Sequence, residues 1–424
     1  MSHQVRECST DQRLTAKLSR RIVVPCSPTV YDQIIGDSPL FRGYLEQAAA
    51  LHPELFPPAF TEGYWLHDVI HSKKMPQVPL RRVKLTATGE VYTVVPSFVL
   101  PYRMGSTDEV EKALFLRRFG VPFWGLTYVF GRNDMYWQRL VQHLGRYDLV
   151  GTTVKDATRL PPHLIVDEKH MRLNGERAYI ALTVGDDCVL GAAIALKAMP
   201  RELTEAYSEF KQEALRLDAA YAPQTVNYDG WEHTQRAWVA LFPAVVIIRC
   251  FLHAFLRIRD RCKRLDTYPL ICHLVWRIYH ATCQTTYYRD FRRLLVFAET
   301  SLSGEPLKAI VRFKAKRAQL AKGLFYPGCH RVSTMLDRHM QSLTRCLYMA
   351  RDFHGHRSSA HLEARAWALM HNFWPYCPRA LARFESPFTS PFHKLNRLCY
   401  HDNWLQNLLV ATSCQHVLVH HKIR

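Results

Sequence analysis

The sequence has no CxxC pair and no cluster of cysteine and histidine at the spacing of zinc ligands, although it contains 12 cysteines. A zinc finger is therefore not expected. A signal-peptide pattern is also missing, and scattered cysteines without one are typical of reduced thiols in a cytoplasmic protein. The one long apolar run, residues 239–256, is interrupted by Pro243 and Arg249, which argues against a membrane span.

Acidic residues are scarce relative to basic ones, with 37 Asp and Glu against 56 Lys and Arg and a net charge of +19. The excess lies in residues 249–350, at +13, and 351–424, at +5, so residues 1–248 are nearly neutral. This distribution indicates a polyanionic partner. The alternative is a basic solvated face without a partner. The length of 424 residues leaves room for two to four domains.

Residues 163–253 show strand and helix patterns in the order strand, hairpin, helix, strand, helix, strand. This is the order of an RNase H-like α/β core. The first and fourth strands of such a core are neighbours, so Asp167 and Asp229 are expected at the ends of adjacent strands, where ligand sites of open α/β sheets lie. The predicted elements are residues 163–167, 177–184, 188–196, 201–217, 224–229, 233–242 and 244–248.

Asp167 and Asp229 are candidate ligands for Mg²⁺. Phosphodiester cleavage by two hard cations needs carboxylates on rigid elements. A single acid after a strand is more often a turn former, and the matching positions of these two favour a site. Glu168 is a poor third ligand because neighbouring strand residues point to opposite faces. Cys250 and His253 are too few for a zinc site and are expected beside the acids in a supporting role.

Two patterns precede the core. The first is a β-hairpin around Thr88-Gly89, with Arg81, Arg82 and Lys84 on its first arm. The second is a set of three short helices that fit a helix-turn-helix, for which the alternative is a spacer without DNA contact. The predicted hairpin arms are 81–86 and 90–95, the helices are 107–119, 122–130 and 133–144, and the side chains on or near the recognition helix are Arg132, Tyr136, Gln138 and Arg139.

The segments Ile165-Val-Asp167, Asn227-Tyr-Asp229-Gly-Trp231 and Cys250-x-x-His253, with a helical stretch after them, resemble a DDE-type insertion-sequence transposase. The C-x-x-H is similar to that of the mutator-like branch. The resemblance covers about residues 51–412. It implies an enzyme that uses two Mg²⁺ ions, with Mn²⁺ as a substitute, to cleave the terminal inverted repeats of its element and to join the 3′-hydroxyls to target DNA. It also implies a dimer or larger assembly in a prokaryotic cytoplasm, associated with the nucleoid.

The resemblance further implies a third acid at the start of the last core helix. Arg331-Val-Ser-Thr-Met-Leu-Asp337 is similar to the family's segment, so Asp337 takes this role and Glu363 is the reserve. The segment departs from the family in having Asp in place of the commoner Glu and Thr334 in place of Asn. These departures leave open a copy with weakened or lost activity.

The resemblance implies that the helical stretch corresponds to the family's insertion and contacts the phosphate backbone, and that the hairpin and helix-turn-helix read sequence. Two alternatives stay open: an inactive or domesticated DNA-binding protein, and an RNase H-like nuclease without end recognition. The predicted regions are an N-terminal region with the hairpin (1–105), the helix-turn-helix module (106–150), the first part of the core (160–256), the insertion (257–328) and the C-terminal helices (329–424). The insertion side chains expected to contact DNA are Arg257, Arg259, Arg261, Lys263 and Arg264.

Overall fold

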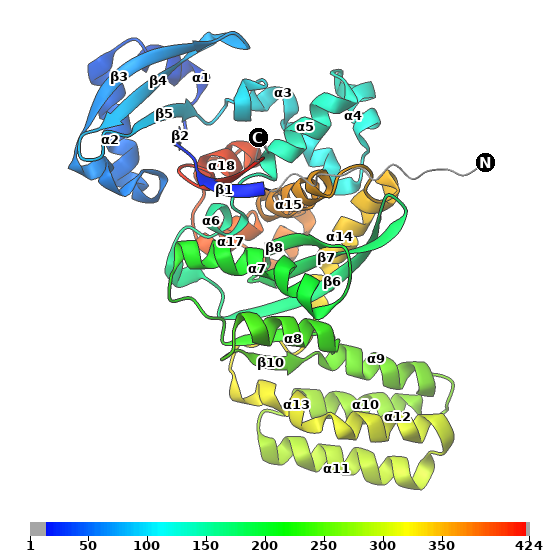
Figure 1. Cartoon of the computed structure of the whole chain (residues 1–424). Helices are drawn as coiled ribbons and strands as arrows, with labels where there is room; N and C mark the ends of the chain where they lie inside the picture. Colours follow the sequence, from blue (N-terminus) through cyan, green and yellow to red (C-terminus); the bar gives the residue numbers. More distant parts are fainter. Residues whose placement is uncertain (1–13, 421–424) are drawn as a thin grey trace.

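The computed structural model describes residues 14–420. Within this range the chain is a mixed α/β protein with 18 α-helices and three β-sheets (Figure 1), which confirms the predicted mixture of helix and strand. A search of the described helices finds none that is long and apolar enough to cross a membrane.

A five-stranded sheet at the centre has the order β10-β9-β6-β7-β8. β6 pairs in parallel with β9, and β9 with β10, whereas β7 and β8 run antiparallel. The first and fourth strands of this region are therefore neighbours, as predicted. Asp186 and Asp187 connect β7 to β8 with positive φ angles of 47° and 71°, the conformation of a two-residue hairpin turn. The strands are β6 (His163–Leu173), β7 (Glu176–Gly185), β8 (Cys188–Ala195), β9 (Thr225–Tyr228) and β10 (Val246–Arg249).

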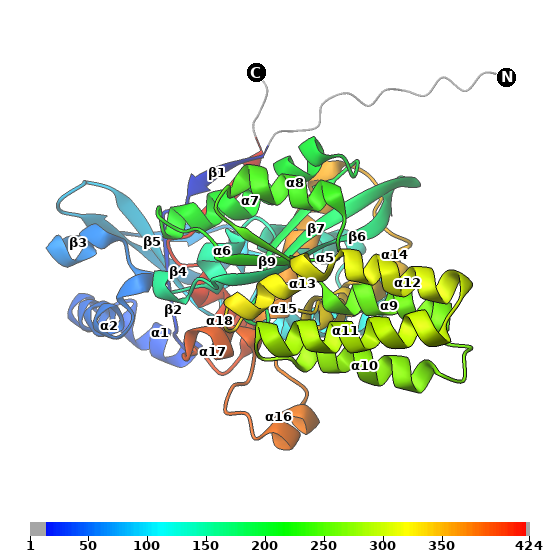
Figure 2. The same ribbon diagram turned by 90° about the horizontal axis from the view of Figure 1, so that it is seen from below.

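Helices cover both faces of this sheet (Figure 2). α7 and α8 pack on one face, around Phe210 and Trp238, while α14 and α15 lie on the other. Every residue of β8 is buried, as expected for a strand covered on both faces. The helices are α7 (Pro200–Leu217), α8 (Glu232–Leu241), α14 (Thr334–Ala350) and α15 (Arg357–Phe373).

The N-terminal region forms a four-stranded sheet of order β2-β5-β4-β3. The predicted hairpin is β4 and β5, which pair from Arg82 opposite Thr93 to Lys84 opposite Val91. β4 begins at Met75, earlier than predicted, and its other edge pairs with β3, so the hairpin lies inside a larger sheet. The elements are β2 (Arg21–Val24), β3 (Tyr64–Ser72), β4 (Met75–Leu85), β5 (Val91–Pro96), α1 (Pro28–Ile34) and α2 (Ser38–Leu51).

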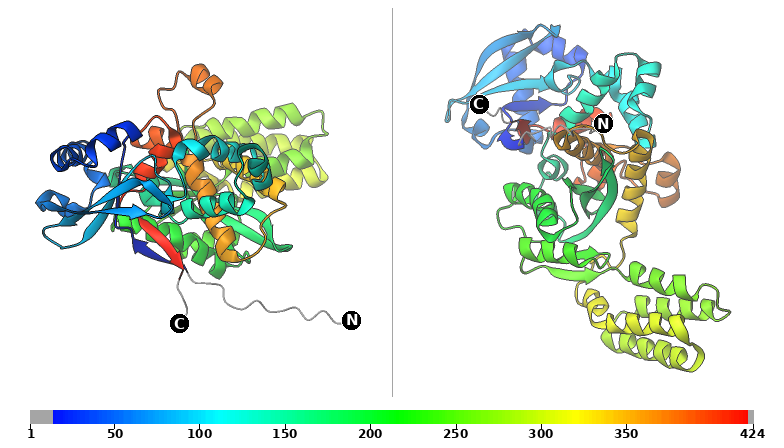
Figure 3. Two further views of the ribbon diagram at one scale, coloured as in Figure 1. Left: turned by 90° about the horizontal axis from the view of Figure 1, so that it is seen from above. Right: turned by 45° about the vertical axis from the view of Figure 1, so that its right-hand side comes forward.

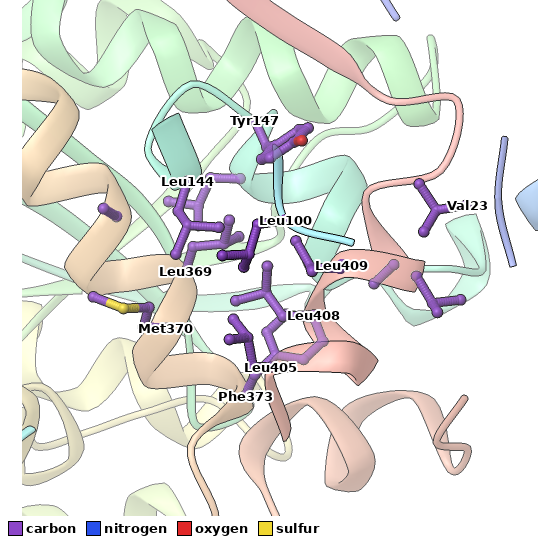
Figure 4. Close-up of a cluster of buried hydrophobic side chains, with 14 of the residues drawn as sticks. Val23, Leu100, Leu144, Tyr147, Leu369, Met370, Phe373, Leu405, Leu408 and Leu409 are labelled. Atoms are coloured by element: carbon purple, nitrogen blue, oxygen red, sulfur yellow. The ribbon is translucent and has the colours of Figure 1, made fainter. Parts of the chain in front are cut away.

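Three helices follow where they were predicted: α3 (Thr107–Leu116), α4 (Phe123–Phe130) and α5 (Asp134–Leu144). α5 packs along α15, and Figure 4 shows that its Leu144 belongs to the same core as the N-terminal sheet, α15 and α18 (Trp404–Ala411). At the ends of the described chain, β1 (Leu14–Leu18) pairs with β11 (His416–His420). These regions are thus joined by one continuous apolar core.

A body of five helices extends from the central sheet beyond β10 (Figures 1 and 3). It has its own apolar core, which includes Phe251, Tyr287, Phe291 and Phe313. The chain then returns to the central sheet through α14. The helices of this body are α9 (Phe251–Cys262), α10 (Tyr268–His280), α11 (Gln284–Ser301), α12 (Gly304–Ala315) and α13 (Arg317–Ala321).

Candidate active site

Asp167 and Asp229 come together at the pairing of β6 with β9. The last paired residues are Ile165 and Asn227, so each aspartate lies two positions beyond a matched pair and on the same side of the sheet. One expectation needs correction: Asp167 is not at the end of its strand. β6 continues to Leu173 because it keeps pairing with β7, and Asp167 lies where the shorter β9 stops.

Asp337 joins these two acids from the first turn of α14, which packs against β6. Burial raises the pKa of Asp167 to about 7, and the neighbouring carboxylates of Asp229 and, more weakly, Asp337 add to the increase. A like charge raises a carboxyl pKa only when it is close. The three acids predicted as one site therefore lie near one another, in β6, directly after β9 and in the first turn of α14.

Ser333 connects Asp337 to the C-x-x-H segment. Its buried hydroxyl donates to Asp337 Oδ2 at 3.1 Å and lies 3.5 Å from both Cys250 Sγ and His253 Nδ1. Sequence reasoning included Ser333 in the family-like segment without giving it a role. A serine at the start of a helix with an acid in the first turn is ordinary, so the sequence held no signal that the two side chains interact.

Cys250 and His253 form a polar pair whose charges act together with those of Asp167 and Asp229. Burial raises the pKa of the Cys250 thiol, but hydrogen bonds with His253 and Ser333 outweigh burial and lower it below its ordinary value. The hydrogen bond with Cys250 raises the pKa of His253 to about 9 against the effect of burial, and the charges of Cys250, Asp167 and Asp229 act in the same direction. The site therefore contains a positive imidazolium beside its carboxylates at neutral pH.

Glu168 faces the opposite side of the sheet, as the strand alternation predicts. Its Oε1 accepts hydrogen bonds from Tyr207 and Thr234, both at 2.8 Å, from the helices on that face. Burial raises its pKa to about 7. Glu168 therefore links β6 to the helices on the face opposite Asp167.

Glu363, the reserve candidate, lies elsewhere. Its Oε1 accepts hydrogen bonds from Gln138 at 3.0 Å and Gln142 at 3.1 Å, both on α5. It is not among the charged groups that shift the pKa of Asp167. The structure thus brings Asp337, and not Glu363, to the first two acids.

The side chains predicted to read DNA are largely engaged within the chain. Arg81 donates to the Ile35 carbonyl at 2.7 Å, and Arg82 donates from Nε to Asp68 at 2.6 Å. Lys84 is exposed. These contacts place the two arginines in roles that hold the N-terminal sheet together.

Most of the predicted DNA-reading side chains on or near the third helix of the helix-turn-helix also bind other residues of the chain. Arg132 pairs with Glu109 at 2.8 Å, Tyr136 donates to the Met104 carbonyl at 3.2 Å, and Gln138 binds Glu363. Arg139 is exposed. In this structure, then, the residues of α5 mainly secure it to its neighbours.

The five predicted cations of the helical body are all exposed. Arg259 pairs with the adjacent Asp260 at 3.1 Å. Arg257 and Arg261 line a hollow between α9 and α12, together with Arg312 and Lys316. Sequence reasoning missed these last two, because the match of α12 to α9 is visible only in the folded chain.

The donor chemistry of the site fits a hard cation, since carboxylate oxygens are the ligands that Mg²⁺ prefers. Burial is the main cause of the raised pKa of Asp167, and the smaller contribution from the charges of Asp229 and Asp337 is of the kind that a bound cation relieves. Within residues 14–420, however, no group of three His, Cys, Asp or Glu side chains is arranged so that it could hold a metal ion. Comparison with protein-family models and with curated proteins finds no match to this chain.

Proposed function

We propose that this protein is a DDE-type DNA transposase that binds the terminal inverted repeats of its mobile element, cleaves them and joins the 3′-ends to target DNA. The observation that carries the proposal is the convergence of Asp167, Asp229 and Asp337 from β6, β9 and α14. The strand order, with the first and fourth strands paired, supports an RNase H-like core. The basic helical body beside the site supports a polyanionic substrate.

Asp167, Asp229 and Asp337 would be the ligands of two Mg²⁺ ions after a rearrangement that brings their oxygens closer together than they lie in this structure. The bound ions would supply activation of the attacking oxygen and stabilisation of the leaving one. Backbone amides of the chain orient the first two of these carboxylates. Asp167 Oδ1 accepts the Glu168 amide N–H at 2.8 Å, and Asp229 Oδ1 accepts the Trp231 amide N–H at 2.7 Å. These bonds fix one oxygen of each carboxylate and leave the other oxygen for a ligand.

His253 contributes a positive charge next to the carboxylates. With a pKa of about 9 it is protonated at neutral pH and offsets part of their repulsion in the absence of metal. Ser333 holds the third carboxylate in place through its hydroxyl. Binding of DNA would then rely on cations outside the acid cluster, chiefly on the helical body.

Cleavage and strand transfer on a duplex that carries the element's own end test the proposal. We expect Asp167→Asn, Asp229→Asn and Asp337→Asn to abolish both reactions with Mg²⁺ or Mn²⁺ while end binding remains. Glu363→Gln is the matched control, an acid on the neighbouring helix, and should remain active.

Three results would contradict the proposal in different ways. Wild-type protein that binds the end but never cuts it would favour an inactive or domesticated DNA-binding protein. Cutting without preference for the end would favour a nuclease. Loss of activity in Glu363→Gln, together with an active Asp337→Asn, would assign the third metal-ligand role to Glu363 in place of Asp337.

A further inference from the structure

A hollow of about 390 Å³ lies between α9 and α12 of the helical body. Its lining includes three buried apolar residues, Ala254, Ala309 and Phe313. Arg257 and Arg261 line it from α9, and Arg312 and Lys316 line it from the α12 side. In each pair the cations are four residues apart, so they project from the same side of the chain about 6 Å apart along the axis.

The positive charge in this hollow is only partly neutralised by the chain. One acid, Asp260, also lines the hollow, and its carboxylate pairs with Arg259 at 3.1 Å. Glu305, close by, binds Lys308 at 3.1 Å and lies 3.8 Å from Arg312. Burial lowers the pKa of Lys316 to about 8, and the charges of Arg249, Arg257 and Arg312 lower it further in that order. Cations from both sides are therefore close enough to repel one another.

Arg249 joins the hollow to the acid site. It ends β10, donates to the Gly230 carbonyl at 3.5 Å, beside Asp229, and donates to Gln319 Oε1 of α13 at 3.2 Å. Gly230 is packed against this guanidinium, since a Cβ there would lie 2.4 Å from Arg249 Nη2. A line of positive charge thus runs from the neighbour of Asp229, through Lys316, into the hollow.

We propose that this line is the path of a single DNA strand whose phosphodiester backbone runs from the carboxylates into the groove between α9 and α12. The inference rests on the proposed function and deepens it. One strand fits because cations from both sides converge on the same space, so that a single backbone contacts them together. Of the five cations predicted from the sequence, the path uses Arg257 and Arg261, and it adds Arg249, Arg312 and Lys316.

Binding of fluorescein-labelled DNA, followed by anisotropy at several salt concentrations, tests this path. The probes are a blunt duplex carrying the element's end and the same duplex with a ten-nucleotide single-stranded extension. The groove variant is Arg257→Gln/Arg312→Gln/Lys316→Gln. The control variant removes the same charge from exposed positions on α11 of the same body, Arg289→Gln/Arg292→Gln/Arg293→Gln.

For wild type we expect the extension to tighten binding at least tenfold. The groove variant should lose this gain, and its plot of log Kd against log salt should be shallower by about 2, the slope expected for three phosphate contacts on a single strand. The control variant should keep most of the gain. Thermal melting checks that both variants fold.

Equal losses in the two variants would overturn the path, because they would show that only the total charge of the body matters. An extension that adds nothing to wild-type binding would overturn it as well, even if the wild type cuts the end. A wild type that binds neither probe would overturn both the path and the proposed function.

Discussion

Replacing Asp167 by Asn should stabilise the metal-free protein at alkaline pH. The pKa of Asp167 rises from 3.8 to about 7 because the carboxyl is buried beside Asp229 and Asp337. A raised carboxyl pKa means that the folded state binds the proton more tightly than the unfolded state, so stability falls as pH rises from about 4 to about 7. A shift of about three units corresponds to about 4 kcal/mol of destabilisation at pH 8, of which about 1.5 to 2 kcal/mol is already present at pH 5.

Asparagine keeps the shape of the side chain and the oxygen that accepts the Glu168 amide N–H, but it carries no charge. Urea unfolding in EDTA should therefore give a gain of up to about 4 kcal/mol at pH 8 and a gain about 2.5 kcal/mol smaller at pH 5. Asp186→Asn, at an exposed hairpin position, is the control and should show a difference of less than about 0.5 kcal/mol at both pH values. A loss of stability in Asp167→Asn, or the same gain at both pH values, would refute the argument that Asp167 is buried among like charges.

Two further predictions concern other parts of the structure. Ser333→Ala removes the hydroxyl that donates to Asp337, and we expect the rate of end cleavage to fall about 10- to 100-fold and to require more Mg²⁺, while end binding is unchanged. Ser333→Thr keeps a hydroxyl and should restore part of the activity. Unchanged cleavage in Ser333→Ala would show that the hydroxyl does not position the acid. Arg365 is 1% exposed and pairs with two glutamates of α7, Glu209 and, at 2.7 Å, Glu213. We therefore expect Arg365→Ala to lower the free energy of unfolding, measured by urea titration, by about 3 to 5 kcal/mol. Arg236, whose ion pair is exposed, is the control, and Arg236→Ala should change this free energy by less than about 1 kcal/mol. Similar values for the two arginines would contradict the role assigned to the buried network.

The parts of the fold that follow from local pattern were predictable. The central strands alternate or are uniformly apolar, and the turn at Asp186-Asp187 marks the hairpin, so both the strands and the pairing of β6 with β9 could be expected. Asp167 and Asp229 followed from that pairing. The end of β6 could not be predicted, because its extension to Leu173 depends on β7 and not on its own composition.

The roles of surface cations were the least predictable. Arg81 and Arg82 look like free positive charges in the sequence, yet the Ile35 carbonyl and Asp68 engage them through contacts 46 and 14 residues away. No pattern in the sequence indicated that Arg312 and Lys316 lie opposite Arg257 and Arg261, because this depends on α12 lying antiparallel beside α9. Charge at a position can be read from a sequence, but whether a partner in the chain neutralises it depends on tertiary structure.

The segments that attach the helical body to the core lie next to the acid site. The body leaves the core at Cys250 and returns at Arg331, and the Phe251 amide donates to the Arg331 carbonyl at 2.8 Å. Asn227 of β9 binds the residue before Arg331, donating to the His330 carbonyl at 2.9 Å. The segments that attach the body are therefore those that carry the C-x-x-H pair and lead into Ser333 and Asp337.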